Sequence, residues 1–297
     1  MAPFIEYVRA VGTGKKGNRD LSYEEAKDMF EQILSQEPDP IQIGAFLLGW
    51  RLKPETITEY SAALEVIRSH TTFHPVPNTI ELGYPYDGKR RNPYIFPVAA
   101  QYMKESGISL VVSADQKQPA KEGITVRELS KSYEFDEQII CFDREEFAPK
   151  VSALSSIRQA LGIRTAFNTL EKLHGVAHSE VGITGVFHKP YVKKYAQIFS
   201  PYFKRLVLIQ GNEGTMEIFS KAKMWIVVGE EITEYSVDPH QFGIEYEKSW
   251  ERISFEDSLH MIQEPTEEFL KLAKLNAAVW LFGYGYFDSI EEGYATL

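Results

Sequence analysis

The feature that most constrains the fold of this chain is a change of periodicity near residue 71. Before this point the sequence carries the signals of helices. Ser22 with Glu25 three residues later predicts a capped helix, and Thr58 with Glu59 predicts the start of another that ends near residue 70. Between them, the stretch IQIGAFLLGWRL is apolar nearly all round, which is typical of a helix buried between neighbours or at a subunit contact. Residues 1–72 are therefore expected to form a small helical domain.

After a polar stretch at residues 71–77, short apolar runs alternate with helical stretches. The runs are Ile80–Leu82, Ile108–Val112, Ile139–Phe142, Arg205–Ile209 and Met224–Val228. This alternation predicts an α/β domain over residues 73–297, with a mostly parallel central sheet and flanking helices. A helical interlude at 152–174 is expected to pack with the N-terminal domain, and residues 265–297 to form two helices, the second opened by Asp288 and Ser289.

Composition narrows the classes of function. The 297 residues are enough for a sizeable core, and 32 Lys and Arg against 42 Asp and Glu give a net charge of −10. This negative net charge disfavours electrostatic binding to nucleic acid or to an anionic membrane over the whole surface. A local basic face is still compatible with an acidic protein. The single cysteine, Cys141, excludes an internal disulfide and favours a reducing compartment, and no apolar run is long enough for a membrane span. We expect a cytoplasmic protein that does not contact membranes.

The segment ELGYPYDGKRRNPY, residues 81–94, is the first candidate site because it stands where a strand gives way to a helix. In an open parallel sheet, ligands bind at that edge. Gly83 and Gly88 allow close backbone approach, Asp87 could hold a ribose hydroxyl or a metal-bound water, and a cluster of cations follows. The candidate phosphate contacts there are Lys89, Arg90 and Asn92, with Arg91 between them and Tyr86 before them. The same residues also suit a solvated basic turn, and the sequence leaves both interpretations open.

Several longer stretches resemble a known family. LSYEEAKDMFEQIL, IRQALGIRTAFNTLEKL, TGVFHKPYVKKYAQIF, LVLIQGNEGTMEI and LNAAVWLFGYGYFDSIEEGYA occur in this order. They resemble landmarks of the anthranilate phosphoribosyltransferases, a branch of glycosyltransferase family 3. The resemblance implies a helical domain through which the protein forms a homodimer. It also implies a cleft between the two domains that binds phosphoribosyl pyrophosphate (PRPP), a phosphorylated sugar, and an aromatic acceptor.

The chain departs from this family in the motifs that carry the chemistry. The family's GTGGDG loop corresponds to Gly83–Gly88, where Tyr84, Pro85 and Tyr86 replace small residues. Its KHGN stretch corresponds to Val112–Asp115, which lacks the cation and adds a carboxylate. Its acidic pair, which holds magnesium, corresponds to Met216 and Glu217. Magnesium thus stays open as a cofactor, with Glu217 as its candidate ligand and Glu213 as a substitute, and we expect weakened or lost anthranilate transfer.

The stretch GIRTAFN, by contrast, keeps the family's sequence. The resemblance implies that an arginine here faces the carboxylate of the acceptor, so Arg164 with Arg158 is expected to form an anion clamp. The alternative is that the segment is kept for packing between the domains. The next residues, Glu171–Gly175, replace a family turn and are expected to change the wall of the acceptor pocket.

A further hypothesis follows from a divergent TrpD-like branch of the family, which Tyr86–Arg90 and Val11–Ser22 resemble. Members of that branch have been linked to nucleic-acid binding, which implies a non-catalytic protein that binds single strands. The candidate phosphate contacts would be Lys89, Arg90, Arg91, Lys189, Lys193, Lys194, Lys204 and Arg205, with Tyr84, Tyr86 or Tyr94 for stacking. Solvated helix faces are the simpler explanation for Lys189–Lys194.

The remaining hypothesis is a phosphoribosyltransferase for another aromatic acceptor. His188 and His240 are expected in surface loops, without a catalytic role.

Overall fold

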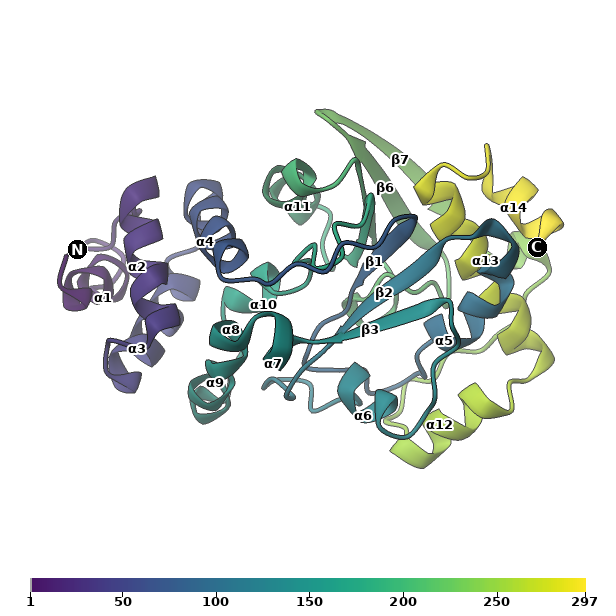
Figure 1. Ribbon diagram of the computed structural model, residues 1–297, viewed down its shortest axis with the longest axis horizontal. Helices are drawn as coiled ribbons and strands as arrows, with labels where there is room; N and C mark the ends of the chain where they lie inside the picture. The colour runs from purple at the N-terminus through teal and green to yellow at the C-terminus, as the bar shows by residue number, and fades with distance from the viewer. Residues whose placement is uncertain (1) are drawn as a thin grey trace.

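The N-terminal part of the chain is helical in the computed structural model, which describes residues 2–297. Helices α1 (Phe4–Gly12), α2 (Tyr23–Ser35), α3 (Pro40–Leu52) and α4 (Ile57–Ser69) form a bundle at one end of the molecule (Figure 1). The predicted capping box of α2 is present, with Ser22 and Glu25 bonded reciprocally. The predicted start of α4 at Thr58 is wrong by two residues, because Thr56 is the residue whose side chain and backbone pair with Glu59.

Helix α3 is buried on one side only. Phe46 and Trp50 are fully buried, whereas Ile41 is 81% exposed and Leu52 is 73% exposed. The all-round apolar pattern therefore combines a core-facing stripe with apolar residues that the single chain leaves uncovered. Such residues are compatible with the subunit contact that the sequence suggested, which stays a prediction.

The α/β domain is built on a seven-stranded sheet with the order β3-β2-β1-β4-β5-β6-β7. The strands are β1 (Thr79–Gly83), β2 (Ser109–Ala114), β3 (Ile139–Asp143), β4 (Val181–Gly185), β5 (Arg205–Ile209), β6 (Ala222–Val228) and β7 (Glu231–Val237). The first five run parallel, in a register that pairs Ile80 with both Leu110 and Val181, and the β6–β7 hairpin adds antiparallel strands at one edge. The predicted α/β class and mostly parallel sheet are confirmed.

Helices cover both faces of the sheet (Figure 1). The shorter ones are α5 (Phe96–Ala99), α6 (Val126–Ser130), α7 (Arg144–Phe147), α8 (Pro149–Ala153), α9 (Ser155–Leu161), α10 (Phe167–Leu170) and α11 (Tyr191–Phe199), with the 3-10 turns η1 (Ala100–Ser106), η2 (Ser200–Tyr202), η3 (Asn212–Gly214) and η4 (Pro239–Phe242). The C-terminal helices are α12 (Phe255–Gln263), α13 (Glu267–Tyr284) and α14 (Ile290–Thr296). Ser289 caps α14, and the prediction of two helices at the end of the chain is confirmed.

The side chains of β5 show how the two faces are filled. Leu206 and Leu208 belong to the apolar cluster that includes Phe30 and Trp50 of the helical bundle. Val207 and Ile209, which alternate with them, belong to a second cluster built around α13. Helices α8, α9 and α10 contact α2, α3 and α4 respectively. The bundle and one face of the sheet therefore share a single hydrophobic core.

The sheet has a topological switch point between β1 and β4, because the chain proceeds from β1 to β2 on one side and from β4 to β5 on the other. The loops that follow β1 and β4 diverge there and leave a crevice. Within residues 2–297, none of the helices combines the length and apolarity needed to cross a bilayer.

Glu59 holds the helical bundle together and provides a test of the fold. Its buried carboxylate accepts hydrogen bonds from the backbone N–H groups of Leu21 and Thr56 at 2.8 Å and from Trp50 Nε1 at 2.9 Å, and it pairs with Lys53 at 2.9 Å. Because Glu59→Ala leaves these donors and the lysine unpaired, we expect it to lower the free energy of unfolding by about 3–5 kcal/mol in urea melts followed by circular dichroism.

The matched control is Glu65→Ala, on the same helix. Glu65 is 47% exposed and pairs with Lys27 at the surface, so its removal should cost less than about 1 kcal/mol. Equal effects of the two substitutions would contradict the central role of Glu59.

Candidate functional site

The switch point opens into a cleft of about 360 Å³ between the helical bundle and the sheet. Arg51 lies on its rim at the end of α3, and the other walls come from the loop after β2, the α9–α10 segment, the loop after β4 with α11, and η3. Its lining residues are Arg51, Lys121, Arg164, Thr165, Asn168, Thr169, Lys172, Phe187, His188, Tyr191, Tyr195, Glu213 and Gly214. Cationic and aromatic side chains thus predominate in the cleft.

The loop after β1, which the sequence singled out as an anion site, is packed inward. Tyr84, Tyr86, Asp87 and Lys89 are each at most 4% exposed. The Tyr84 ring meets the Tyr94 ring edge to face, with the centroids 5.0 Å apart. The loop is therefore part of the core and leaves no open backbone cradle.

Lys89 and Glu217 face each other inside the protein. The Lys89 ammonium pairs with Glu217 Oε2 and donates to the carbonyl of Pro93 at 2.7 Å. The other Glu217 oxygen accepts from the Tyr84 hydroxyl at 2.7 Å and from the N–H of Ile95 at 2.6 Å. Burial beside this carboxylate raises the pKa of Tyr84 well above its usual value, so the phenol stays a donor.

The other residues of the predicted loop also have partners within the protein. Glu213 accepts from the backbone N–H of Arg90 at 2.7 Å and of Arg91 at 3.1 Å, and the Asn92 amide pairs reciprocally with the backbone of Ser249. At Gly88, whose φ is +77°, a Cβ would lie 2.5 Å from the Ile124 carbonyl oxygen.

Gly83 is equally confined. A Cβ there would lie 2.9 Å from Thr184 Oγ1, Lys172 O and Leu173 Cδ2. Both glycines therefore permit close packing within the protein, and the roles of this loop as ligand contacts stay predictions.

The residues at this place do not fit a magnesium site. Glu217 already accepts from an ammonium, a phenol and a backbone N–H, and its neighbour Met216 is a buried thioether. The substitute, Glu213, is engaged by two backbone N–H groups. Across residues 2–297, no group of three or more His, Cys, Asp or Glu side chains converges as a ligand set.

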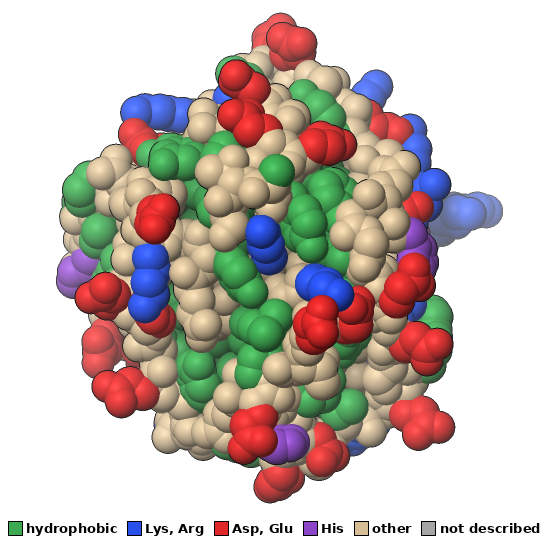
Figure 2. All heavy atoms as spheres, turned by 90° about the vertical axis from the view of Figure 1, so that its right-hand side faces the viewer, with side chains coloured by type: hydrophobic (Ala, Val, Ile, Leu, Met, Phe, Trp, Pro, Cys, Tyr) green, Lys and Arg blue, Asp and Glu red, His purple; other side chains and the backbone are tan. Residues whose placement is uncertain are grey.

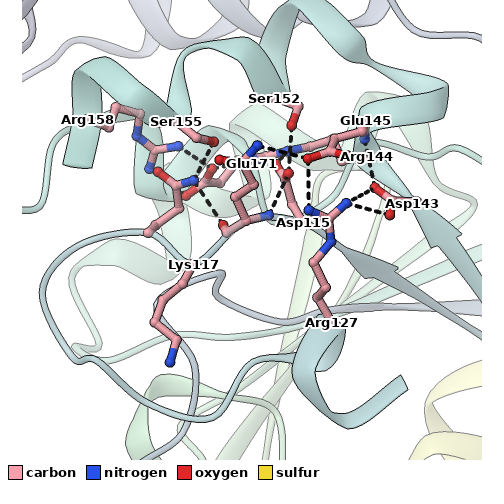
Figure 3. Close-up of polar contacts among 12 residues, drawn as sticks. Asp115, Lys117, Arg127, Asp143, Arg144, Glu145, Ser152, Ser155, Arg158 and Glu171 are labelled. Atoms are coloured by element: carbon pink, nitrogen blue, oxygen red, sulfur yellow. Dashed lines mark hydrogen bonds and ion pairs between the residues drawn. The ribbon is translucent and has the colours of Figure 1, made fainter. Parts of the chain in front are cut away.

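A second buried network lies at the ends of β2 and β3 (Figure 3). Arg144 Nε donates to Asp115, whose other oxygen accepts from the Ser152 hydroxyl at 2.6 Å. Arg144 also pairs with Glu171 at 2.8 Å, and its guanidinium stacks 3.9 Å from the centroid of the Tyr86 ring. The carboxylate of Asp115 is therefore neutralised by an arginine from α7.

Arg158, one half of the predicted anion clamp, belongs to the same network. Its side chain is 1% exposed and forms a bidentate pair with Glu171, with distances of 2.6 and 2.7 Å. Despite burial, the charges of Arg158 and Arg144 hold the pKa of Glu171 down at about 2. The structure thus places Arg158 behind the cleft wall and Arg164 on the cleft.

Arg164, Lys121 and Lys172 are the cations that face the cleft interior. Asp87, fully buried, lies 3.4 Å from Lys121 and 3.7 Å from Arg164. Lys172 is 8% exposed and donates to the carbonyl of Gly185 at 2.8 Å. Burial, together with the nearby Arg164 charge, lowers the pKa of Lys172 to about 8. Burial also lowers the pKa of Lys121, an effect that Asp87 opposes.

Two buried polar groups of the cleft wall have no hydrogen-bond partner. They are the hydroxyl of Thr165 and the Nδ2 amide of Asn168, whose residues are 1% and 5% exposed. Buried donors are normally satisfied, so these two mark a place where a ligand oxygen would complete them. Both stand in the GIRTAFN stretch, for which the sequence suggested an anion clamp of Arg164 with Arg158 and no role for these two side chains.

Sequence reasoning missed Lys121, Lys172 and Tyr195. Lys172 lies in the segment flagged as a changed pocket wall, so a signal was present, but nothing in the sequence indicated that its side chain points inward. Lys121 sits in a polar loop without a motif. His188, expected in a surface loop, is exposed on the rim of the cleft.

Exposed aromatic side chains continue the cleft into a neighbouring groove that shares Phe187 and Glu213 with it. Phe187 is 64% exposed, Tyr191 41% and Trp250 69%. The Trp250 ring lies 4.5 Å from the Lys248 ammonium and 5.9 Å from the Arg91 guanidinium. The face that points away from the helical bundle instead carries scattered acidic groups between apolar patches (Figure 2).

Four of the other basic residues proposed for a nucleic-acid groove have internal partners, whereas Lys193 is exposed. Lys189 pairs with Glu234 at 2.8 Å, and Lys204 with Glu180 at 2.7 Å. Lys194 donates to the backbone of Glu55, and Arg205 to the carbonyl of Gly283. Two of the predicted set lie beside exposed aromatic rings: Arg91 is 5.9 Å from the Trp250 ring centroid, and Lys194 is 5.6 Å from that of Tyr191.

Comparison with known proteins identifies the family. A model described as the helical bundle domain of a glycosyl transferase family matches residues 5–71, and one described as its a/b domain matches residues 121–297. An uncharacterized protein of Aquifex aeolicus is 30% identical over 288 residues, covering 94% of this chain and 93% of the relative. The chain belongs to glycosyltransferase family 3. Residues 72–120, which include the altered loop, lie between the two matched ranges.

Other members of glycosyltransferase family 3 confirm the anthranilate phosphoribosyltransferase-like fold. An anthranilate phosphoribosyltransferase of Persephonella marina is 25% identical over 319 residues, covering 97% of this chain and 91% of the relative. The Saccharomyces cerevisiae enzyme in complex with PRPP and Mg superposes with a TM-score of 0.75 at 18% identity, covering 98% of this chain and 91% of that one. The Thermus thermophilus enzyme gives 0.74 at 18% identity, covering 97% and 92%.

The Lys89–Glu217 pair can be tested through stability. Because Lys89→Met leaves a buried carboxylate without its cation, it should lower the free energy of unfolding by about 3–5 kcal/mol. The double variant Lys89→Met with Glu217→Gln should recover at least about 1 kcal/mol relative to the sum of the single substitutions, as a double-mutant cycle in urea measures.

The control for this cycle is Lys204→Met. Its ammonium is 76% exposed and pairs with Glu180 at the surface, so we expect a change below about 1 kcal/mol. A similarly small effect of Lys89→Met would be the behaviour of a solvent-facing phosphate contact, and would refute the internal role.

Proposed function

We propose that this protein binds an anion in the cleft between its two domains and has lost magnesium-dependent phosphoribosyl transfer to anthranilate. The observation that carries the proposal is the engagement of Glu217. This carboxylate is fully buried among Lys89, Tyr84 and the Ile95 N–H, so it is not free to hold a divalent cation.

The chemistry explains why this matters. Transfer of a phosphoribosyl group requires stabilisation of the departing pyrophosphate, which magnesium and open cationic groups supply in a dry cleft. In this chain the cation of the altered loop, Lys89, and the arginine of the second network, Arg144, both neutralise the protein's own carboxylates. Neither of these two cations is free to stabilise a leaving pyrophosphate.

The cleft itself supports an anion site. Arg164, Lys121 and Lys172 line it, and the unpartnered donors of Thr165 and Asn168 are buried in the same wall. A phosphate or carboxylate there would accept hydrogen bonds from these groups and would balance their charge. A phosphorylated sugar or another small anion is the class of ligand we propose.

Assembly and location extend the proposal. We propose a homodimer formed through the N-terminal helices, where Ile41 and Leu52 are left exposed on α3. We also propose a cytoplasmic location, which the single free cysteine, Cys141, supports.

Titration calorimetry with PRPP tests the loss of the metal-dependent reaction. We expect the affinity for PRPP to be the same with and without magnesium, and no turnover of anthranilate, because the acidic residue is engaged internally. Tight binding of PRPP that requires magnesium, together with anthranilate turnover, would overturn the proposal. Turnover with a different planar acid in a ligand screen would favour the alternative of another aromatic acceptor.

Inorganic phosphate probes the anion site itself. Arg164→Met should weaken phosphate binding roughly tenfold, because it removes a charge-assisted contact. Arg9→Met, which removes an exposed arginine from α1, is the control and should leave the affinity unchanged.

A second candidate function is binding of single-stranded nucleic acid, favoured by the exposed rings of Phe187, Tyr191 and Trp250 along the cleft and the adjoining groove. Aromatic rings flanked by cations are typical of surfaces on which unpaired bases stack. The net charge of −10 weighs against this candidate, so it ranks second.

An electrophoretic shift assay with a short oligonucleotide tests this candidate. If it is right, binding should fall steeply between low and moderate salt, and Trp250→Ala should weaken it about tenfold, whereas Tyr286→Ala, an exposed ring outside the groove, should not. Absence of binding at low salt would remove the candidate.

A further inference from the structure

Lys172 stands out among the cations of the cleft because it is buried without a counter-ion. Its ammonium donates to a backbone carbonyl, and among the described residues no carboxylate lies within 4.0 Å of it. Arg144 and Arg158, which are just as buried, each pair closely with Glu171. A buried charge without a partner is costly, so a group of opposite charge is missing at this place.

The charges around the cleft define how much negative charge is missing. Three cationic side chains face its interior and a fourth lies on its rim, and two carboxylates, those of Asp87 and Glu213, lie near them. Glu171, which also lies near Lys172, is already matched by two arginines. Two positive charges therefore remain unbalanced. The four cations are Arg51, Lys121, Arg164 and Lys172.

Aromatic side chains complete the wall beside these cations. The Tyr195 ring lies 5.5 Å from the Lys172 ammonium and is buried, and Tyr191 and Phe187 lead from it to the rim. A planar ring bound against this wall would place an attached anionic group near Lys172, Arg164 and the free donors of Thr165 and Asn168.

We propose that the cleft selects an aromatic phosphomonoester in its dianionic form, bound without a metal, and that Lys172 is the residue that determines this selectivity. The inference rests on the proposed anion-binding function and specifies its ligand class. A phosphomonoester carries nearly two negative charges at neutral pH and three acceptor oxygens, which match the charge surplus and the unpartnered donors. Lys172 belongs to Glu171–Gly175, the segment expected from the resemblance to take the place of a family turn.

The proposal predicts a proton balance that can be measured on the unmodified protein. Burial and the Arg164 charge lower the pKa of Lys172 to about 8, with Asp87 and Glu171 opposing. The other charged or titratable groups of the cleft lining are Lys121, Arg51, Glu213, His188 and the phenols of Tyr191 and Tyr195. A bound dianion raises the pKa of Lys172, so binding at pH 8 should take up roughly half a proton, and affinity should fall as the pH rises above 8.

Calorimetry with phenyl phosphate, in buffers of different ionisation enthalpy at pH 8, measures this uptake. Benzenesulfonate, a planar monoanion of similar size, is the matched ligand and should bind at least about tenfold more weakly. Equal affinity for the two ligands, or binding of phenyl phosphate without proton uptake, would overturn the inference while leaving an anion site in place. Failure of phosphate, phenyl phosphate and benzenesulfonate alike to bind would instead refute the proposed function.

Substitutions assign the uptake to one residue. Lys172→Met should weaken phenyl phosphate at least about tenfold and abolish proton uptake, whereas Lys172→Arg should keep the preference for the dianion and lose the pH dependence near 8. Lys121→Met should weaken binding but retain the uptake. Lys150→Met, an exposed lysine of α8 outside the cleft lining, is the control. Proton uptake that persists in Lys172→Met would contradict the assignment.

Discussion

A charge buried in a protein without a partner is costly, and the Lys89–Glu217 pair satisfies this constraint at the centre of the α/β domain. Neither group can turn toward a ligand without leaving the other unpaired in the interior. The Tyr84 hydroxyl and the Ile95 N–H both donate to the other carboxylate oxygen, Oε1. The conformation of the loop after β1 and the loss of a free acidic group are thus two aspects of one interaction.

The same constraint distinguishes structural ion pairs from the candidate binding site in the rest of the molecule. Asp115, Arg144, Glu171 and Arg158 form a closed network whose charges match one another, and it fastens the ends of β2 and β3 to the α7–α10 segment (Figure 3). Lys172 lies beside this network and has no such match. Unbalanced charge, rather than the number of basic residues, distinguishes the cleft from the protein surface.

The sequence predicted the fold class and most strands, because their apolar runs and turn residues act locally. It did not reveal β4, whose VGITG run has two glycines, or β7, whose side chains mostly face solvent. The site was harder still, because a side chain's role depends on partners far along the chain. Lys89 and Glu217 are 128 residues apart, and no local pattern shows that they meet. The position of Arg164 on the cleft could be predicted, because the segment around it resembles the family's sequence.

The hydrophobic core that runs without a break from the helical bundle to the sheet limits how a ligand can enter. The rings of Phe30 on α2 and Phe167 on α10 stack with centroids 5.9 Å apart, directly across the junction of the two parts. A hinge motion of the whole bundle would separate such contacts and expose apolar surface to water. A ligand therefore meets a cleft whose walls are already held in place, and it passes the exposed rim side chains Phe187 and Tyr191 on its way in.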